Sequence, residues 1–267
     1  MTNVEKIRSN LSGRTSNINL FVYDCVTSTN DLAKEFVKDG FDKETVIISR
    51  EQTAGRGRRG RSFFSPDATG IYMSIVLRPE CPVELLSLLT PAAAVATAKS
   101  LEKASGKKVD IKWINDIFLD GKKICGILCE TSFDSTRKMP SVVVGIGINL
   151  CDPRGGFPEE ISEIASSLFG SAAMDEDVPS MICAEIINLL VDYSDSIVER
   201  PFLEEYKKRM FLLGKEITVI SGTDAYLATV TDIDDDAHLT VTLPDNSVKV
   251  LNAGEISIKP FAPIKKG

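Results

Sequence analysis

The pattern of apolar residues changes near residue 213, and this change constrains the fold more than any single motif does. Before it, apolar stretches typical of strands alternate with stretches typical of helices. After it, short apolar stretches are separated by turn signals such as Pro244-Asp245-Asn246-Ser247. Residues 239–243 alternate between apolar and polar, as in a strand with one face in water. We therefore predict a large α+β domain over residues 1–211 and a small β-barrel over residues 212–267.

Turn and capping signals separate the elements predicted within these two parts. Thr27-Ser28-Thr29-Asn30-Asp31 is a helix-start signal. Asp120-Gly121, between two apolar stretches, predicts a two-residue hairpin turn, and Pro91 predicts a break after Thr90 in a long helix. The predicted strands are 18–23, 45–50, 71–77, several within 109–149 that end in a buried strand at 141–149, and then 217–220, 226–231, 239–243, 248–251 and 256–258. The predicted helices are one from residue 28 to Gly40, then 84–104, 181–198 and 201–210.

Charge and histidine content argue against several functions. The chain has 267 residues, a formal net charge of -7 and one histidine. The negative charge argues against a nucleic acid as the main partner. We expect the lone His238, beside three aspartates, to be solvated, which argues against a histidine-dependent triad or a multi-histidine zinc site. No run approaches the roughly 18 apolar residues of a membrane span. The first residues also lack the apolar core of a secretory signal, so we expect a cytoplasmic protein without a membrane partner.

The six cysteines are expected to be reduced thiols, because nothing at the start of the chain indicates secretion. Cys125 and Cys129 could suggest a metal pair. They fall in a predicted strand, however, where four residues span about 13 Å, which is too far for one zinc ion. We predict that both are core thiols.

The segment Gly55-Arg56-Gly57-Arg58-Arg59-Gly60-Arg61 has the spacing of a dinucleotide fingerprint and nearly that of a P-loop. Both motifs need a helix directly behind the glycines. Here Phe63-Phe64-Ser65-Pro66 follows, so we expect no helix and neither motif. The glycines still allow tight bending, and the arginines suit carboxylate or phosphate oxygens. A nucleic-acid patch or a mobile surface loop remains an alternative for this segment.

Ordered motifs along the chain resemble those of the biotin–protein ligases. The matching segments are Ser28-Thr29-Asn30, Gln52 with residues 54–61, Lys112-Trp113-Ile114-Asn115-Asp116, Lys123-Ile124-Cys125-Gly126-Ile127-Leu128-Cys129-Glu130, Gly145-Ile146-Gly147-Ile148-Asn149 and Gly254-Glu255-Ile256-Ser257. The resemblance covers residues 20 to 260. Ile114 stands where the family usually has proline, and Phe63 stands where tryptophan is common.

The resemblance implies a fold and a reaction. The fold would be a class II aminoacyl-tRNA synthetase-like mixed sheet flanked by helices, with an SH3-like C-terminal barrel. Biotin and ATP, with Mg²⁺, would give biotinyl-adenylate, and a lysine of a biotin carboxyl carrier protein would then take the biotin. Fewer than 20 residues precede the first predicted strand. We therefore expect no DNA-binding domain and no nucleic-acid partner; a monomer and a homodimer both stay open.

The same resemblance assigns roles to particular residues. Arg58 and Lys123 are expected to be catalytic, and the loop is expected to be disordered when empty and to close on the ligand. Lys123 could instead be a solvated turn lysine, Ser28 and Thr29 could be helix caps, and Trp113 could be a plain core residue. The biotin-binding residues would be Ser28, Thr29, Asn30, Gln52, Arg56, Gly57, Arg58, Trp113, Lys123 and Gly126; the ATP-binding residues would be Arg61, Asn115, Asp116 and Asn149, with Asp116 also at Mg²⁺.

Two rival functions remain. A lipoate–protein ligase would use a similar fold and chemistry, but that family has a characteristic histidine near its glycine-rich loop, and no histidine lies near this one. A nucleic-acid-binding protein would use the arginine-rich loop and the barrel. It predicts binding that depends steeply on salt.

Overall fold

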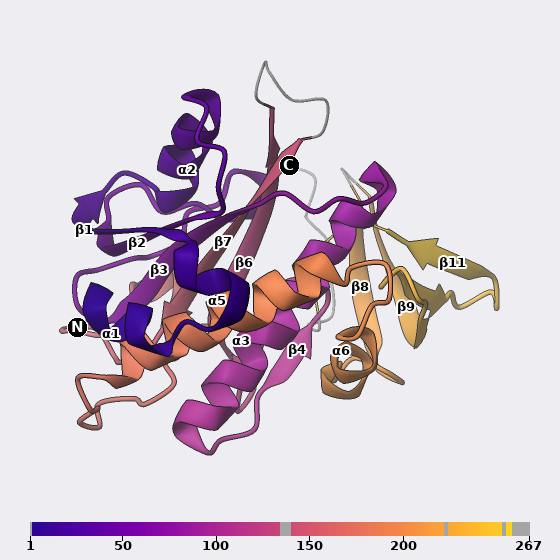
Figure 1. Ribbon diagram of the computed structural model, residues 1–267. Helices are drawn as coiled ribbons and strands as arrows, with labels where there is room; N and C mark the ends of the chain where they lie inside the picture. Colours follow the sequence, from indigo (N-terminus) through magenta and orange to yellow (C-terminus); the bar gives the residue numbers. More distant parts are fainter. Residues whose placement is uncertain (1, 134–139, 222–223, 253–254, 258–267) are drawn as a thin grey trace.

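A seven-stranded mixed sheet forms the centre of the protein (Figure 1). The computed structural model describes residues 2–133, 140–221, 224–252 and 255–257. The order of strands is β1-β2-β3-β7-β6-β5-β4; β1 and β2 run parallel, and every other neighbouring pair is antiparallel. The strands are β1 Asn19–Val26, β2 Thr45–Gln52, β3 Gly70–Leu77, β4 Asp110–Lys112, β5 Asp116–Leu119, β6 Lys122–Ser132 and β7 Ser141–Asn149.

Helices cover both faces of this sheet. Helix α2 lies on one face, where Ala33 and Val37 pack with Ile47, Val76 and Val143 from the strands. The larger core lies on the other face, against α3 and α5, which pack on each other. The helices are α1 Val4–Asn10, α2 Thr29–Lys38, α3 Leu89–Ser105, α4 Glu159–Ser162, α5 Val178–Asp195 and α6 Leu203–Arg209, with 3-10 turns at Gly13–Asn17, Arg58–Gly60 and Val83–Leu88.

Strand β7 carries apolar side chains that pack on both faces of the large sheet. Val142, Val144 and the isoleucines at 146 and 148 belong to the large core, whereas Val143 packs under α2. Side chains of a strand alternate between faces, so Gly145 and Gly147 lie on the α2 face. The continuous apolar run is thus a strand buried on both faces, as predicted, with glycines where the α2 face opens.

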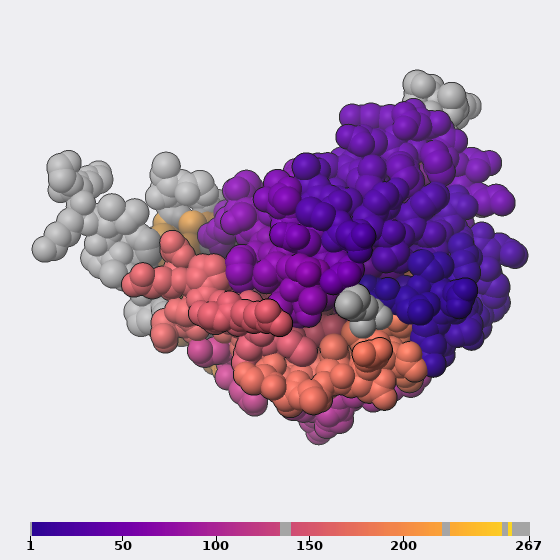
Figure 2. All heavy atoms as spheres, turned by 90° about the vertical axis from the view of Figure 1, so that its left-hand side faces the viewer, coloured from indigo at the N-terminus to yellow at the C-terminus, as the bar shows by residue number. Residues whose placement is uncertain are grey.

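The N-terminal segment packs against a helix far along the chain. The backbone N–H of Asn3 donates to Ser180 Oγ at 2.9 Å, and α1 lies beside α5. Figure 2 shows this side of the molecule, where the indigo N-terminal part meets the orange part of the chain. The sequence analysis did not predict α1. Its signal is the capping residue Asn3, whose side chain accepts from the N–H of Lys6.

The C-terminal part forms a second, five-stranded antiparallel sheet in the order β11-β10-β9-β8-β12. This confirms the predicted change to short strands after residue 213. The last predicted strand reaches residue 258 and the last motif begins at Gly254; both residues lie outside the described part. The strands are β8 Glu216–Ser221, β9 Asp224–Ile233, β10 Leu239–Thr242, β11 Val248–Leu251 and β12 Glu255–Ser257.

The local turn predictions were confirmed, with one shift. Asp120 and Gly121 have φ values of 50° and 78° and join β5 to β6; two positive φ values are those of a type I′ hairpin turn. The break in the long helix falls before Leu89 rather than after Thr90. Pro91 therefore lies in the first turn of α3, where no intrahelical partner for its missing N–H is required.

His238 is not simply solvated, which corrects the expectation for this residue. Its side chain is half-buried, and its Nδ1 lies 3.0 Å from Asp234 Oδ2, while its backbone N–H donates to Asp234 Oδ1 at 2.8 Å. The carboxylate of Asp234 organises the turn between β9 and β10 and holds the imidazole against it.

Cys125 and Cys129 both lie in β6, as predicted, with Cys125 fully buried and Cys129 half-buried. Burial raises the pKa of the Cys125 thiol. Among the helices of the described ranges, none is both long and apolar enough to cross a membrane.

Candidate ligand pocket

A pocket opens on the α2 face of the large sheet, between the start of α2, the segment 56–63, the β4–β5 turn, and strands β6 and β7. Ile256 of the C-terminal sheet also lines it. Nearly all the predicted site residues meet here. Those that line the pocket are Ser28, Thr29, Asn30, Gln52, Arg56, Gly57, Arg58, Arg61, Trp113, Asn115, Asp116, Lys123 and Gly126.

Three glycines form part of the pocket wall, and a Cβ at each of them would press against neighbouring side chains. A Cβ on Gly147 would lie 2.6 Å from the ring of Phe63, and one on Gly145 would lie 2.1 Å from Asn30 Oδ1. Gly126 pairs with Gly147 across β6 and β7, and its Cβ would meet Lys123 and Phe63 at 3.1 to 3.3 Å. The glycines therefore let these side chains approach the bare backbone of the sheet.

The start of α2 is fixed by hydrogen bonds that also shape the pocket. Ser28 Oγ accepts from the N–H of Asp31 at 3.4 Å, so Ser28 caps the helix, as the alternative for this residue foresaw. Thr29 donates to Gln52 Oε1 from its backbone N–H at 2.9 Å and from its hydroxyl at 3.2 Å. Gln52 Nε2 donates to Ser65 Oγ at 3.0 Å. Helix α2, β2 and the segment after the loop are thereby joined.

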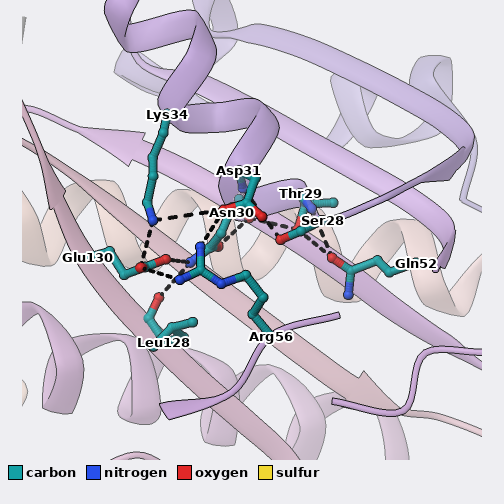
Figure 3. A network of polar contacts seen from close by, with 10 residues as sticks. Ser28, Thr29, Asn30, Asp31, Lys34, Gln52, Arg56, Leu128 and Glu130 are labelled. Carbon is teal, nitrogen blue, oxygen red and sulfur yellow. Dashed lines mark hydrogen bonds and ion pairs between the residues drawn. The ribbon is translucent and has the colours of Figure 1, made fainter. Parts of the chain in front are cut away.

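Asn30 is 4% exposed and already engaged on both sides of its amide. Its Nδ2 donates to the carbonyl of Leu128 at 3.2 Å and to Glu130 Oε2 at 2.9 Å (Figure 3). Its Oδ1 lies 2.6 Å from Ser74 Oγ. An amide N–H₂ has two protons, and both are already donated within the protein. Asn30 therefore acts here as part of the pocket framework, and a direct contact with biotin stays a prediction.

The glycine-arginine loop, residues 55–61, folds as a narrow arch over the pocket. The N–H of Gly57 donates to the carbonyl of Arg61 at 2.7 Å, and the N–H of Phe63 donates to that of Gly55 at 2.8 Å. Arg59 and Gly60 both have positive φ, at 55° and 75°. No helix follows, as predicted, so neither nucleotide motif is present. The loop has a defined conformation in this structure, and its closure on a ligand stays a prediction.

Arg58 and Lys123 both line the pocket, and they contact two successive residues, Asn115 of the β4–β5 turn and Asp116 at the start of β5. Arg58 Nη1 donates to Asn115 Oδ1 at 3.1 Å, and Lys123 Nζ lies 2.7 Å from Asp116 Oδ1. Asn115 is itself held to β6, because its Nδ2 donates to the carbonyl of Ile127 at 2.8 Å. The two cations predicted to be catalytic are thus brought together from segments 65 residues apart.

Lys123 is held by its backbone as well as by its side chain. Its N–H donates to the carbonyl of Ile164 at 2.8 Å, and its carbonyl accepts from the N–H of Ser166 at 2.9 Å. The side chain is 32% exposed. Lys123 is therefore a strand residue that lines the pocket, and the alternative of a solvated turn lysine is wrong.

Trp113 both lines the pocket and belongs to the core. It is 4% exposed, and its Nε1–H donates to the carbonyl of Ala237 in the β9–β10 turn at 2.9 Å. The buried Tyr206 donates from its hydroxyl to the carbonyl of Ile114 at 3.1 Å. The C-terminal sheet and α6 therefore fix the segment that carries Trp113.

Asn149 is the one predicted site residue that does not line the pocket. It lies at the end of β7, and its Nδ2 donates to the carbonyl of Ser166 at 3.0 Å. Its predicted contact with ATP therefore stays a prediction.

Several residues that line the pocket are not among the predicted site residues, and they include Gly145, Gly147 and Ile256. Gly145 and Gly147 belong to a quoted motif, and glycine inside a strand is itself a signal of close approach. Ile256 also belongs to a quoted motif, but nothing in that motif indicates a position at the pocket, which Ile256 reaches from the second sheet.

The comparisons with known proteins agree with this geometry. Residues 22–149 match the Biotin/lipoate A/B protein ligase family, and residues 212–259 match the Biotin protein ligase C terminal domain. The Paracoccus denitrificans biotin--[acetyl-CoA-carboxylase] ligase is 32% identical, over 81% of this chain and 91% of its own length. The Bacillus subtilis bifunctional ligase/repressor BirA is 38% identical over 66% of this chain. This chain spans about half the length of that protein and of its Bacillus spizizenii counterpart.

Solved structures extend the likeness to the fold. The biotin protein ligase from Aquifex aeolicus in complex with biotin and ATP superposes with a TM-score of 0.72 at 26% identity, over 90% of this chain and 97% of that one. The Leishmania major biotin protein ligase in complex with biotin gives a TM-score of 0.59 at 26% identity, over 88% and 98%. Sequence, fold and the arrangement of motifs around one pocket together identify this chain as a member of the biotin protein ligase family.

Proposed function

We propose that this protein activates biotin with ATP as biotinyl-5′-AMP and transfers the biotin to a lysine of a biotin carboxyl carrier protein. The observation that carries the proposal is that Arg58 and Lys123 line one glycine-walled pocket and contact the successive residues Asn115 and Asp116. The activities named for the relatives, biotin–[acetyl-CoA-carboxylase] ligase among them, support the choice of substrate.

The first step joins two anions. A carboxylate oxygen of biotin attacks the α-phosphorus of ATP, the mixed anhydride forms, and the bond to pyrophosphate breaks. Two fixed cations lower the repulsion between carboxylate and phosphate. Arg58 and Lys123 supply this charge, and Asn115 and Asp116 hold them in position by the contacts already described.

In the second step, the uncharged amine of the acceptor lysine attacks the anhydride carbonyl. The amide forms, the amine loses a proton, and AMP leaves. No covalent nucleophile of the enzyme is needed, which suits a pocket lined by arginine, lysine and amide groups. The arch of the glycine-arginine loop would keep water from the anhydride.

The other predicted roles belong to the same proposal. Gln52 and Thr29 would face the ureido group of biotin, Trp113 its apolar part, and Arg61, Asn115, Asp116 and Asn149 the ATP. Mg²⁺ belongs to the proposal because Asp116, which pairs with Lys123 in this structure, would offer one carboxylate to an ion that favours carboxylate together with phosphate oxygens. When bound, the ion would neutralise phosphate charge. Residues 1–211 would form the catalytic domain and residues 212–267 the SH3-like domain.

The test is ATP–pyrophosphate exchange measured with biotin, followed by transfer of biotin to a purified biotin carboxyl carrier domain. We expect exchange that needs biotin, and a carrier whose mass rises by one biotin. Exchange that depends on lipoate and not on biotin would support the lipoate alternative instead. Tight DNA or RNA binding that weakens steeply with salt, without any exchange, would support the nucleic-acid alternative.

A further inference from the structure

Glu130 of β6 receives donors from three residues in two other segments of the chain, α2 and the glycine-arginine loop (Figure 3). Its Oε1 lies 2.6 Å from Lys34 Nζ and 3.0 Å from Arg56 Nη2, and its Oε2 accepts from Asn30 Nδ2 at 2.9 Å. The side chain is 20% exposed and does not line the ligand pocket. It can therefore affect a ligand only through the residues that it holds.

Through Arg56, Glu130 holds the glycine-arginine loop. Both terminal nitrogens of the guanidinium are engaged: Nη2 with Glu130, and Nη1 with Asp31 on α2. Arg56 is thus paired with one carboxylate of α2 and with one carboxylate of β6. The loop is thereby fastened to the two elements that flank the pocket.

Through Asn30, Glu130 also holds the pocket wall. The Nδ2 group of Asn30 shares its protons between Glu130 and the carbonyl of Leu128. The amide lies against Gly145, at a distance that leaves no room for a Cβ. One carboxylate thus orients a wall residue with one oxygen and the loop with the other.

The charge of Glu130 is suited to this position. Burial opposes its ionisation, but hydrogen bonds from Lys34 and Asn30 and the charges of Lys34 and Arg56 outweigh burial, so the pKa of Glu130 lies below its ordinary value. A glutamine could not replace it, because its N–H₂ would face either the amide of Asn30 or the two cations.

We propose that Glu130 is a positioning residue for biotin activation, which acts through Arg56 to hold the glycine-arginine loop over the pocket and through Asn30 to fix the pocket wall. The proposal rests on the proposed function for its ligand. It also gives Arg56 a different role from the one predicted from the sequence, since Arg56 fastens the loop to α2 and β6 and need not bind the ligand itself.

The first test uses ligand-free protein, so it does not depend on the proposed function. Backbone hydrogen exchange is measured in the loop, where Gly57 and Phe63 donate the hydrogen bonds that define the arch. We expect Glu130→Gln and Arg56→Met each to speed this exchange about fivefold, the effect of a partly exposed ion pair worth about 1 kcal/mol. Lys34→Met is the matched control, because Lys34 pairs with Glu130 and lies 3.9 Å from Asp31 Oδ1 but contacts no loop residue among the described contacts. It should leave loop exchange within about twofold of the parent.

The second test measures how long the enzyme retains biotinyl-adenylate. Trp113 is the only tryptophan in the chain and lines the pocket, so its fluorescence reports occupancy without turnover. We expect dissociation about fivefold faster in Glu130→Gln and in Arg56→Met. The increase in the double variant should stay below the product of the two single increases, because both changes break the shared contact between Arg56 and Glu130.

Several results would overturn the proposal. They are parent-like loop exchange in both Glu130→Gln and Arg56→Met, an equal effect from Lys34→Met, or effects that multiply in the double variant. If Glu130→Gln does not fold, Arg56→Met decides alone, because Arg56 is a surface residue with a side chain 38% exposed. A parent enzyme that makes no adenylate would refute the proposed function, while loop exchange would still test the role of Glu130.

Discussion

Gly145 carries the sharpest test of the pocket wall. A Cβ at this position would lie 2.1 Å from Asn30 Oδ1 and 2.8 Å from its Cγ, closer than non-bonded atoms approach. Gly145 lies in the middle of β7 between β3 and β6, so its backbone has little freedom to move. Gly145→Ala must therefore displace the side chain of Asn30.

The cost can be worked from the contacts that would be lost. Moving Asn30 separates its amide from the Leu128 carbonyl and from Glu130, in a site that is 4% exposed. Overpacking costs about 1–3 kcal/mol, and each buried polar group left without a partner costs a similar amount. We expect Gly145→Ala to lower the free energy of unfolding by about 2–4 kcal/mol.

In a variant that lacks the Asn30 side chain, Gly145→Ala should leave the free energy of unfolding nearly unchanged or should raise it. In an Asn30→Ala background the new methyl group has space, and replacing glycine by alanine then stabilises by about 0.4–1 kcal/mol through the unfolded chain. The assay is urea unfolding followed by far-ultraviolet circular dichroism, for the parent, both single variants and the double variant. An equal cost of Gly145→Ala in both backgrounds would refute the reasoning, because the clash would then not involve Asn30.

Three further outcomes are expected. Gly147→Ala should weaken ligand binding, measured by fluorescence titration, about tenfold, while unfolding changes by about 1 kcal/mol, because the half-buried Phe63 ring can rotate away from the new methyl group. Trp113→Phe should cost about 2–3 kcal/mol of stability in urea, since it leaves the buried carbonyl of Ala237 without its donor; a loss below about 0.5 kcal/mol would contradict that contact. The folded-state pKa of Glu130 is lowered, so its stabilising contribution is present above its ordinary pKa of 4.5 and is lost as the pH falls further. The stability difference between the parent and Glu130→Gln should accordingly stay level above about pH 5.5 and shrink as the pH falls from about 5 to about 3, and a constant difference over this range would speak against it.

Local features of this chain were predictable because they depend on neighbouring residues. Asp120-Gly121 specifies its turn through backbone conformations that few other residues adopt. Phe63 to Pro66 exclude a helix behind the glycine-arginine loop, so these residues alone rule out both nucleotide motifs. The short strands after residue 213 follow from alternation and turn residues alone.

The assembly of the pocket depended on contacts between distant segments. No local pattern indicates that Arg58 meets Asn115, that Arg56 reaches Glu130, or that Asn149 turns away to Ser166. The sequence by itself determined which chemical groups the chain carries and where its turns lie, since both depend on residue type and near neighbours. Tertiary structure decided which of those groups bind a ligand and which hold the framework, because a side chain's role depends on the partners that packing brings within reach.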